Sequence, residues 1–169
     1  SDSRITNIGQ KVRKYKLDEF TQLWNVFLGE MSLVGPRPNV QRDIDLYTDN
    51  EKELLMVKPG ITDFSSIIFS DEGDILKEYE DPDLAYNQLI RPWKSRLGLI
   101  YIKNQTTMID LKLIFFTILA IVSKKNAIKL VVSELSRIGV DPIIINVSKR
   151  EENLYPYPPP GQDKIVVSR

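Results

Sequence analysis

The chain has 169 residues, of which 42% are hydrophobic and 27% charged, and this composition predicts one globular domain with room for a small appendage. Basic and acidic residues both number 23, so no net charge favours binding to nucleic acid. The absence of histidine and cysteine excludes Ser-His-Asp and Cys-His catalysis, structural zinc and disulfides. Catalytic groups must therefore come from Asp, Glu, Lys, Tyr, Ser or Thr, and any metal must be a hard cation such as Mg²⁺.

The first part of the chain predicts helices separated by a rigid loop. The expected elements are a helix, a loop, a second helix and a turn, over residues 17–28, 32–38, 40–57 and 58–62. Gly29 is the expected end of the first helix. Gly35, Pro36 and Pro38 exclude a regular helix, so we expect them to hold Arg37 in a rigid loop.

The remainder of the chain predicts further helices and a few short strands. The expected helices cover residues 84–90, 94–103, 108–123 and 127–138, the expected strands 67–69, 142–147 and 165–167, and an extended segment 155–161. The segment 108–123 is apolar nearly all round, which fits either a buried core helix or a helix dipping into a bilayer interface. It is too short to span a membrane comfortably, and Lys124, Lys125 and Lys129 follow it.

Together these elements predict a mostly helical α+β fold. Amphipathic helices would surround a compact core over residues 1–125, and residues 126–169 would add a small appendage containing short strands. No signal peptide opens the chain. The first residue is Ser1 and not an initiator Met, so we expect a processed or truncated start. A basic segment over 1–17 and an acidic loop over 71–83 lie hidden within the neutral total.

Asp18 and Glu19 form an adjacent carboxylate pair near the predicted start of the first helix. Close like charges raise one another's pKa unless a cation lies between them, which favours a Mg²⁺ site or a pair of nucleophile and base. A solvated pair stabilised by the helix dipole is the alternative interpretation.

Arg37 offers a fork of N–H donors suited to phosphate, and two flanking prolines would restrict it. A purely structural Pro-Arg-Pro loop is the alternative. Arg13, Lys14 and Lys16 precede the carboxylate pair and would add to a phosphate site or form a solvated basic face. Carboxylates with arginine and no histidine indicate chemistry on a phosphorylated substrate with Mg²⁺.

The stretch RKYKLDEFTQLWNVFLGEMSLVGPRP, residues 13–38, resembles the signature of the bacterial sugar transferases, the monotopic polyprenyl-phosphate phosphoglycosyl transferases. Later blocks are also similar to that family: KPGIT at 58–62, YIKN at 101–104 and DLK at 110–112. The resemblance spans about residues 4–125, and its specificity lies in the order and spacing of the blocks.

The resemblance implies transfer of a sugar 1-phosphate from a UDP-sugar to undecaprenyl phosphate with release of UMP, which begins the assembly of exopolysaccharide, capsule, O-antigen or glycoprotein glycans. The implied route is ping-pong, with the phosphosugar carried on Asp18, Glu19 as its partner at Mg²⁺, and Arg37 and Arg13 near the phosphates.

The family's location is the cytoplasmic face of the bacterial inner membrane, reached through a re-entrant N-terminal helix and amphipathic interface helices. That helix is missing from this sequence, so the piece is compatible with a soluble state. A homodimer stays open and nucleic acid is not an expected partner.

The sequence departs from the family pattern at two internal places. After Thr62 many members continue Gly-Trp-Ala-Gln-Val-Asn-Gly-Arg, whereas here residues 63–70 contain no arginine, and Gly98 takes the place of an acidic residue. Candidate substitutes for the missing charges are Arg91, Lys94, Arg96, Asp71 and Asp74.

Two rival functions remain at this stage. One is a non-catalytic interaction module that uses the apolar helix 108–123 and the proline-rich tail, and UDP-sugar with Mg²⁺ would not raise its thermal stability. The other is an ordinary soluble nucleotide-sugar enzyme, which lacks support because no glycine-rich phosphate loop is present.

Overall fold

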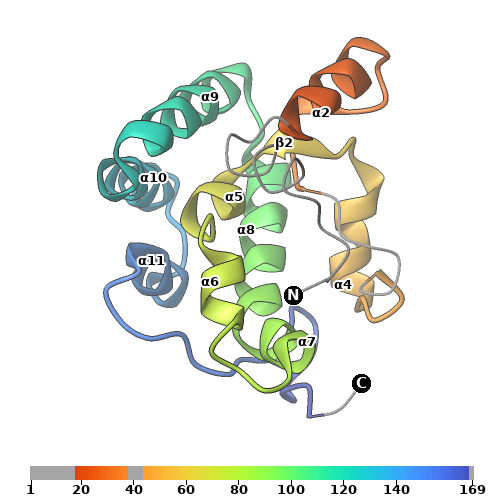
Figure 1. The fold of residues 1–169 in the computed structure, drawn as a ribbon, viewed down its shortest axis with the longest axis vertical. Coiled ribbons are helices and arrows are strands. Elements are labelled where there is room, and N and C mark those ends of the chain that lie inside the picture. The colour runs from red at the N-terminus through yellow and green to blue at the C-terminus, as the bar shows by residue number, and fades with distance from the viewer. Residues whose placement is uncertain (1–17, 38–43, 168–169) are drawn as a thin grey trace, which may run out of the picture.

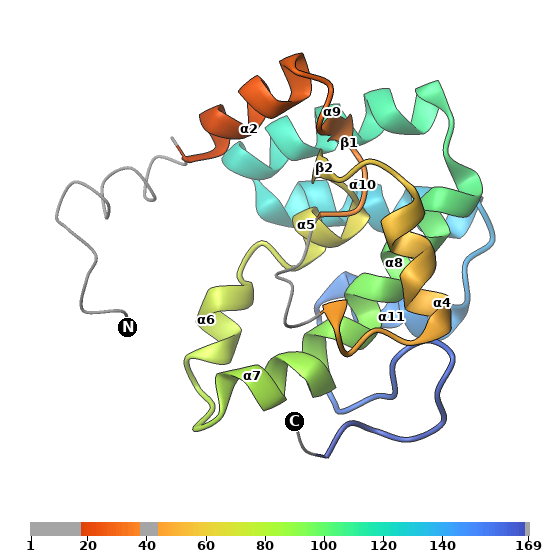
Figure 2. The ribbon, with the colours of Figure 1, turned by 90° about the vertical axis from the view of Figure 1, so that its right-hand side faces the viewer.

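Helix α8 (Arg91–Asn104) runs through the middle of the molecule, and the other elements pack around it (Figure 1). The computed structural model describes residues 18–37 and 44–167, with the backbone alone for 18–21. Figure 2 shows α2 and α9 together at one end of the molecule and α7 at the other. The predicted mostly helical α+β class is confirmed.

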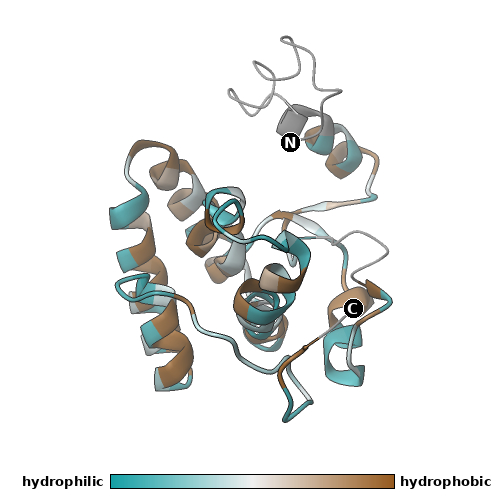
Figure 3. Cartoon of the chain, turned by 60° about the horizontal axis from the view of Figure 1, so that its bottom comes forward, coloured by the Kyte–Doolittle hydropathy of each residue, from teal (hydrophilic) through white to brown (hydrophobic). Residues whose placement is uncertain are grey.

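The described elements are, in chain order, α2 (Asp18–Phe27), β1 (Ser32–Val34), α4 (Asp49–Lys52), the 3-10 helix η1 (Glu53–Met56), β2 (Gly60–Thr62), α5 (Phe64–Ile68), α6 (Glu72–Leu76), α7 (Pro82–Ala85), the π-helix η2 (Tyr86–Ile90), α8, α9 (Thr107–Val122), α10 (Lys124–Arg137) and α11 (Pro142–Lys149). The ribbon coloured by hydropathy shows hydrophobic and hydrophilic residues on the same helices, as amphipathic packing requires (Figure 3).

The core forms around α5, which contacts α8, α9 and α10. Its largest buried apolar side chains are Trp93, Tyr101, Phe64, Ile68, Ile90, Leu97, Leu113 and Leu135. The pair α9 and α10 folds back at Ser123, and the ion pair between Lys112 Nζ and Glu134 Oε2, 2.8 Å long, joins the two helices. Helix α11 packs on α10 and α8, so the residues after 124 share this core.

β1 and β2 form a parallel pair with Ser32 opposite Gly60 and Val34 opposite Thr62. Beyond the pair, Gly35 N donates to Thr62 O at 2.9 Å and Gly60 N donates to Pro36 O at 3.0 Å. A Cβ added to Gly60 would lie 2.1 Å from the Gly35 nitrogen, so the backbones approach too closely for any side chain. This contact fixes the course of the chain into Arg37.

A buried ion pair fastens α4 to α8. Arg91 Nε donates to Glu51 Oε1 at 3.0 Å, and Ser95 Oγ donates to the same oxygen at 2.6 Å. Thr48 caps α4 and exchanges hydrogen bonds with Glu51 at both ends of the capping box. Removing either charged partner would leave the other buried alone, which makes this contact a strong constraint.

The proline-rich tail packs against its own chain. The Tyr157 ring stacks on Trp93 with centroids 4.4 Å apart, and Arg96 Nη1 donates to the Pro158 carbonyl at 2.8 Å. Thr48 Oγ1 donates to the Pro160 carbonyl, and both Pro159 and Pro160 are buried. Residues 155–159 form neither helix nor strand, in line with the predicted extended segment, but they are committed to the fold and do not offer a free docking segment.

Several predicted helices are confirmed. Segment 17–28 contains α2, segment 94–103 lies within α8, segment 108–123 matches α9, and segment 127–138 matches α10. Gly29 and Gly139 follow α2 and α10 with φ of 78° and 75°, the left-handed conformation that ends helices at glycine.

Two predictions in the first half were wrong. A continuous helix over 40–57 is excluded in the described part, since Thr48 begins α4 and the chain tightens into η1, while residues 38–43 lie outside the described residues. Residues 60–62 form β2 and not a turn, because β1 supplies a partner that local sequence cannot reveal.

The predicted strands at 67–69, 142–147 and 165–167 were also wrong. Asp63 caps α5 through Ser66 N at 2.7 Å, and Asp141 caps α11 through Ile143 N at 2.8 Å, with Pro142 in its first turn. These caps outweigh the β propensity of the isoleucine-rich runs. Residues 165–167 form no strand, so the C-terminal part contains α11 in place of the expected short strands.

The acidic loop over 71–83 is used for internal contacts. Asp71 pairs with Lys124 at 2.9 Å and with Arg150 at 3.3 Å, and Glu72 pairs with Lys94 at 2.8 Å. Asp81 caps α7 by accepting from two backbone N–H groups. The loop therefore ties α6 and α7 to α8, α10 and the end of α11.

The glycine contact between the strands predicts a selective loss of stability. Gly60→Ala should lower the free energy of unfolding by about 2–3 kcal/mol, because the new Cβ overlaps the Gly35 backbone. The matched control is Gly73→Ala in α6, where the added Cβ has no atom within 4 Å. This substitution should raise the free energy of unfolding by about 0.5–1 kcal/mol. Urea denaturation measures both, and equal effects would contradict the close approach.

Candidate active site

Helix α2 presents the predicted catalytic pair at its first turn. Asp18 and Glu19 are its first two residues, where the positive end of the helix dipole stabilises carboxylates. Their side chains lie outside the described part of the structure, as does all of Arg13. The position of the pair on the helix is thus established, whereas its side-chain geometry and the roles of Asp18, Glu19 and Arg13 stay predictions.

A short turn carries the chain from α2 into β1. The carbonyl of Asn25 accepts hydrogen bonds from Glu30 N at 2.9 Å and Met31 N at 3.1 Å, after Gly29 has ended the helix. Ser32 N then donates to Pro59 O at 2.8 Å, which joins the turn to the strand pair. Because α2 also contacts both strands, the helix that bears the carboxylate pair and the loop that bears Arg37 are parts of one local unit.

Arg37 follows directly from the strand pair. Pro36 accepts the hydrogen bond from Gly60, so the backbone is held up to the residue before Arg37, and the Arg37 side chain is exposed. The predicted rigid loop is therefore anchored, although residues 32–34 form a strand within it. Because this backbone is fixed, contact of Arg37 with an external phosphate would cost side-chain entropy but little backbone entropy.

Two further family blocks brace this strand from behind. The hydroxyl of Tyr101 in α8 donates to Asp110 Oδ1 at 2.7 Å and lies 3.3 Å from the Val34 carbonyl oxygen. Burial, followed by the hydrogen bond to Asp110, raises the pKa of Tyr101 well above its usual range, so this hydroxyl stays protonated and donates. The first residues of the blocks at 101–104 and 110–112 thus position β1.

Gly98 has a packing role at this site. A Cβ at Gly98 would lie 2.7 Å from Leu54 Cδ2 and 3.6 Å from Pro36 Cβ, so α8 approaches the Pro36–Arg37 loop closely. An acidic side chain there would have to displace Leu54. The departure from the family pattern at this position is therefore accompanied by tight packing under the loop.

The segment that replaces the family's Gly-Trp-Ala-Gln-Val-Asn-Gly-Arg run is buried. Asp63 is 1% exposed and accepts hydrogen bonds from Ser65 Oγ and Ser66 N. Next to it, Thr62 Oγ1 lies 2.6 Å from Thr117 Oγ1 in α9. Burial raises the pKa of Asp63, and the hydrogen bonds from Ser66 and Ser65 only partly oppose that effect. This segment supports β2 from α5 and α9 and supplies no cation.

None of the proposed substitutes for the missing charges is free within the described residues. Arg91 and Lys94 pair with Glu51 and Glu72, Arg96 donates to two carbonyls, and Asp71 and Asp74 pair with basic side chains. The contacts of Arg91, Lys94 and Asp71 join separate helices, that of Arg96 reaches the tail, and that of Asp74 is a local exposed pair.

Sequence reasoning did not identify the bracing residues Tyr101 and Asp110 as partners. Both lie in blocks that resemble the family, and that was the available signal. No sequence signal indicated the ion pair between Glu51 and Arg91, because 40 residues separate the two along the chain.

Comparison with known proteins agrees with this arrangement of blocks. The chain belongs to the bacterial sugar transferase family, whose model matches residues 1–124. This confirms the predicted family, and the match includes α2, both strands, α8 and α9.

Curated relatives carry informative names. The chain is 35% identical over 127 residues to the UDP-galactose-lipid carrier transferase of Erwinia amylovora and, to the same extent, to the undecaprenyl-phosphate galactose phosphotransferase of Salmonella typhimurium. Each match covers 75% of this chain and 23% of the relative. The exopolysaccharide production protein ExoY of Sinorhizobium fredii is 33% identical over 120 residues, covering 71% of this chain and 46% of ExoY. The chain thus spans less than half the length of these relatives.

The buried carboxylate Asp63 predicts a pH-dependent difference between two proteins. A raised pKa in the folded state means that Asp63 disfavours folding increasingly as pH rises from about 4 through that pKa. Asp63→Asn keeps a capping oxygen without the charge. The free energy of unfolding of the variant minus that of wild type should therefore increase as pH rises. Denaturation at a series of pH values measures the difference.

Asp81→Asn is the matched control, because Asp81 is an exposed cap with the same hydrogen-bonding role. It should show no comparable gain at higher pH. If the free energies of unfolding of wild type and Asp63→Asn differ by the same amount at every pH, ionisation of the buried Asp63 does not cost stability and the prediction is contradicted.

Proposed function

We propose that this chain is the catalytic part of an enzyme that transfers a sugar 1-phosphate from a UDP-sugar to undecaprenyl phosphate and releases UMP, at the start of bacterial surface glycan synthesis. The observation that carries the proposal is the convergence of the family's sequence blocks on one strand pair. Blocks 13–38 and 58–62 contribute β1 and β2, and Tyr101 with Asp110 holds β1 from the other side.

The reaction would proceed in two displacements at one phosphorus atom. An Asp18 carboxylate oxygen attacks the phosphorus bonded to the sugar, the bond from that phosphorus to the bridging oxygen breaks, and UMP leaves with that oxygen. A phosphate oxygen of undecaprenyl phosphate then attacks the same phosphorus. This breaks the acyl phosphate, regenerates the Asp18 carboxylate and yields the undecaprenyl diphosphosugar.

Basic groups would neutralise the charge of the donor's diphosphate. Arg37 can offer two N–H groups to phosphate oxygens from its anchored loop, and Arg13 lies five residues before Asp18 in the sequence. The N-terminus of α2 adds its partial positive charge near the attacked phosphorus. Glu19 would hold or move a proton beside the nucleophile.

The donor chemistry of Asp18 and Glu19 fits Mg²⁺, which prefers carboxylate and phosphate oxygens. Among the side chains that the structure describes, no group of three or more acidic residues gathers to hold a metal. A bound Mg²⁺ would supply charge neutralisation at the diphosphate and allow the two carboxylates to stay ionised together.

The nucleophile assignment is tested on protein that includes its natural upstream sequence. Asp18→Asn should reduce UMP release by about 10³-fold or more, because the amide cannot form the acyl phosphate. Asp74→Asn is the matched control, since Asp74 is an exposed carboxylate paired with Lys77, and it should retain activity. Full activity of Asp18→Asn would contradict the assignment.

The donor panel follows from the relatives' names. They include phosphotransferases of galactose, glucose and N-acetylgalactosamine, so UDP-galactose, UDP-glucose and UDP-N-acetylgalactosamine are the first donors to assay. Silence across the panel together with no thermal shift by any UDP-sugar would leave the non-catalytic module as the better account.

We also propose that one end of the molecule lies on the cytoplasmic leaflet of the membrane. Helix α9 exposes an apolar stripe that the fold leaves uncovered: Met108, Leu111, Phe115, Ile118, Ile121 and Val122. Trp24 and Phe27 are exposed on α2. That helix lies at the same end of the molecule as α9 (Figure 2). No helix in the described ranges has the length and hydropathy to cross a bilayer, so the stripe would lie in the interface.

The stripe can be tested with two isoleucines. Ile118→Asp should weaken binding to vesicles by about tenfold, because a charge replaces an apolar group that would be buried among the lipids. Ile143→Asp makes the same exchange at an exposed position of α11 and should leave binding unchanged. Vesicle flotation measures the binding of both variants. Equal losses of vesicle binding would contradict a membrane contact through the α9 stripe.

A further inference from the structure

A cavity of about 610 Å³ lies between the first half of α10 and the end of α11. It is lined by five basic, two acidic and two apolar residues: Lys124, Lys125, Lys129, Lys149, Arg150, Asp71, Glu151, Ile128 and Val132. Asp71 is the single lining residue that precedes Lys124, so the cavity is formed almost wholly by residues at or beyond the end of the family match.

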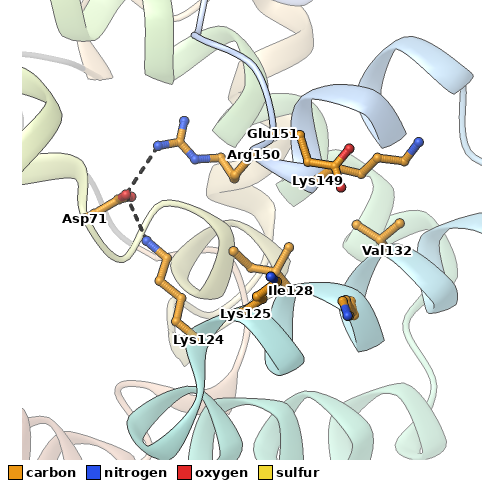
Figure 4. Close-up of a pocket in the computed structure, with 9 residues that line it drawn as sticks. Asp71, Lys124, Lys125, Ile128, Val132, Lys149, Arg150 and Glu151 are labelled. Carbon is orange, nitrogen blue, oxygen red and sulfur yellow. Dashed lines mark hydrogen bonds and ion pairs between the residues drawn. The ribbon is translucent and has the colours of Figure 1, made fainter.

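The basic side chains of the cavity are only partly neutralised. Asp71 is shared between Lys124, at the start of α10, and Arg150, which directly follows α11 (Figure 4). Lys125 and Lys129 have no carboxylate within ion-pair distance among the described residues, and Lys149 contacts an amide, Asn146 Oδ1 at 3.2 Å. The lining therefore carries a net positive charge that the fold does not balance.

Arg150 is held in place at some backbone cost. Its φ is 56°, the left-handed conformation that favours glycine at a helix end, yet an arginine occupies the position. Its guanidinium carbon lies 5.5 Å from the centroid of the Phe69 ring and its Nη2 donates to Asp71. The buried Nε has no acceptor, so the guanidinium retains unused donor capacity.

The start of α10 adds positive potential to the same place. Lys124 and Lys125 lie in its first turn, and that turn contains no acidic residue. Lysines at this end oppose the helix dipole, which makes the arrangement unfavourable unless an anion is nearby. The N-terminus of this 14-residue helix and the five basic side chains therefore both favour a negatively charged ligand.

We propose that this cavity binds a phosphorylated ligand at a site separate from the one formed by α2 and β1. Lys125, Lys129, Lys149 and Arg150 would contact the phosphate oxygens, while Ile128 and Val132 supply the apolar part of the lining. A phosphate group fits better than a carboxylate because several cations can each meet a different oxygen.

The phosphate has two chemical sources, a soluble phosphate ester or a phospholipid headgroup. The second is reachable because the exposed stripe of α9 ends at Val122, two residues before Lys124. Both sources use the same cations. The experiment therefore has a soluble arm and a vesicle arm.

In the soluble arm, inorganic pyrophosphate is titrated by calorimetry at constant ionic strength and without divalent cations. Lys125→Gln with Lys129→Gln should weaken binding by about tenfold or more, because two charge-assisted contacts are lost. Lys52→Gln with Lys77→Gln removes the same charge from exposed positions outside the cavity and should bind as wild type does. All four lysines are exposed or only partly covered, so both double variants should fold.

In the vesicle arm, the same proteins are floated with phosphatidylglycerol or with phosphatidylcholine vesicles. Pyrophosphate binding that depends on the cavity lysines would identify a soluble ligand. Phosphatidylglycerol binding that falls by about tenfold in the cavity variant and not in its control, without pyrophosphate binding, would identify a headgroup. Equal behaviour of the two double variants in both arms, or no binding in either arm, would overturn the proposal.

Discussion

Gly35 and Gly60 bring the backbones of β1 and β2 together at a distance that a side chain on Gly60 would prevent. The strand pair that results is short, yet α2, α5 and α9 all contact it. It joins a turn that follows α2 to the loop that carries Arg37, and Tyr101 hydrogen-bonds toward its far side from α8. A two-residue constraint thus relates four sequence blocks that are spread over a hundred positions of the chain. A site for phosphoryl transfer depends on such positioning, since catalysis there comes mainly from orientation and electrostatics.

Local sequence signals were sufficient for the long helices and insufficient for the strands. Periodic apolar residues located α2, α8, α9 and α10, because those signals lie within single segments. The pairing of β1 with β2 depends on residues 28 positions apart, and the isoleucine runs at 67–69 and 142–147 became helical because Asp63 and Asp141 cap them. At the candidate site the sequence located Arg37 in an anchored loop and placed Asp18 and Glu19 on a helix. The Tyr101–Asp110 contact could not be derived, since it depends on how α8 and α9 meet.

The residues beyond 124 are integrated with the family core. Glu134 of α10 is nearly buried, and its pKa is lowered by Arg137 and Lys112, the latter from a family block. Tyr157 stacks on Trp93, the tail reaches Thr48 at the cap of α4, and Arg150 pairs with Asp71. A boundary near residue 125 stays a prediction. In physical terms the later segment packs on α8 and α9 and lines the basic cavity that we propose as a second ligand site.

The central claim is that Asp18, at the start of α2, becomes covalently phosphorylated by the donor. Mass spectrometry of protein with its natural upstream sequence, incubated with UDP-sugar and Mg²⁺ in the absence of acceptor, tests this most directly. The account predicts a mass increase equal to one phosphosugar, mapped by fragmentation to Asp18 and removed when undecaprenyl phosphate is added. Turnover to the undecaprenyl diphosphosugar without any such adduct, or an adduct on a residue other than Asp18, would contradict it.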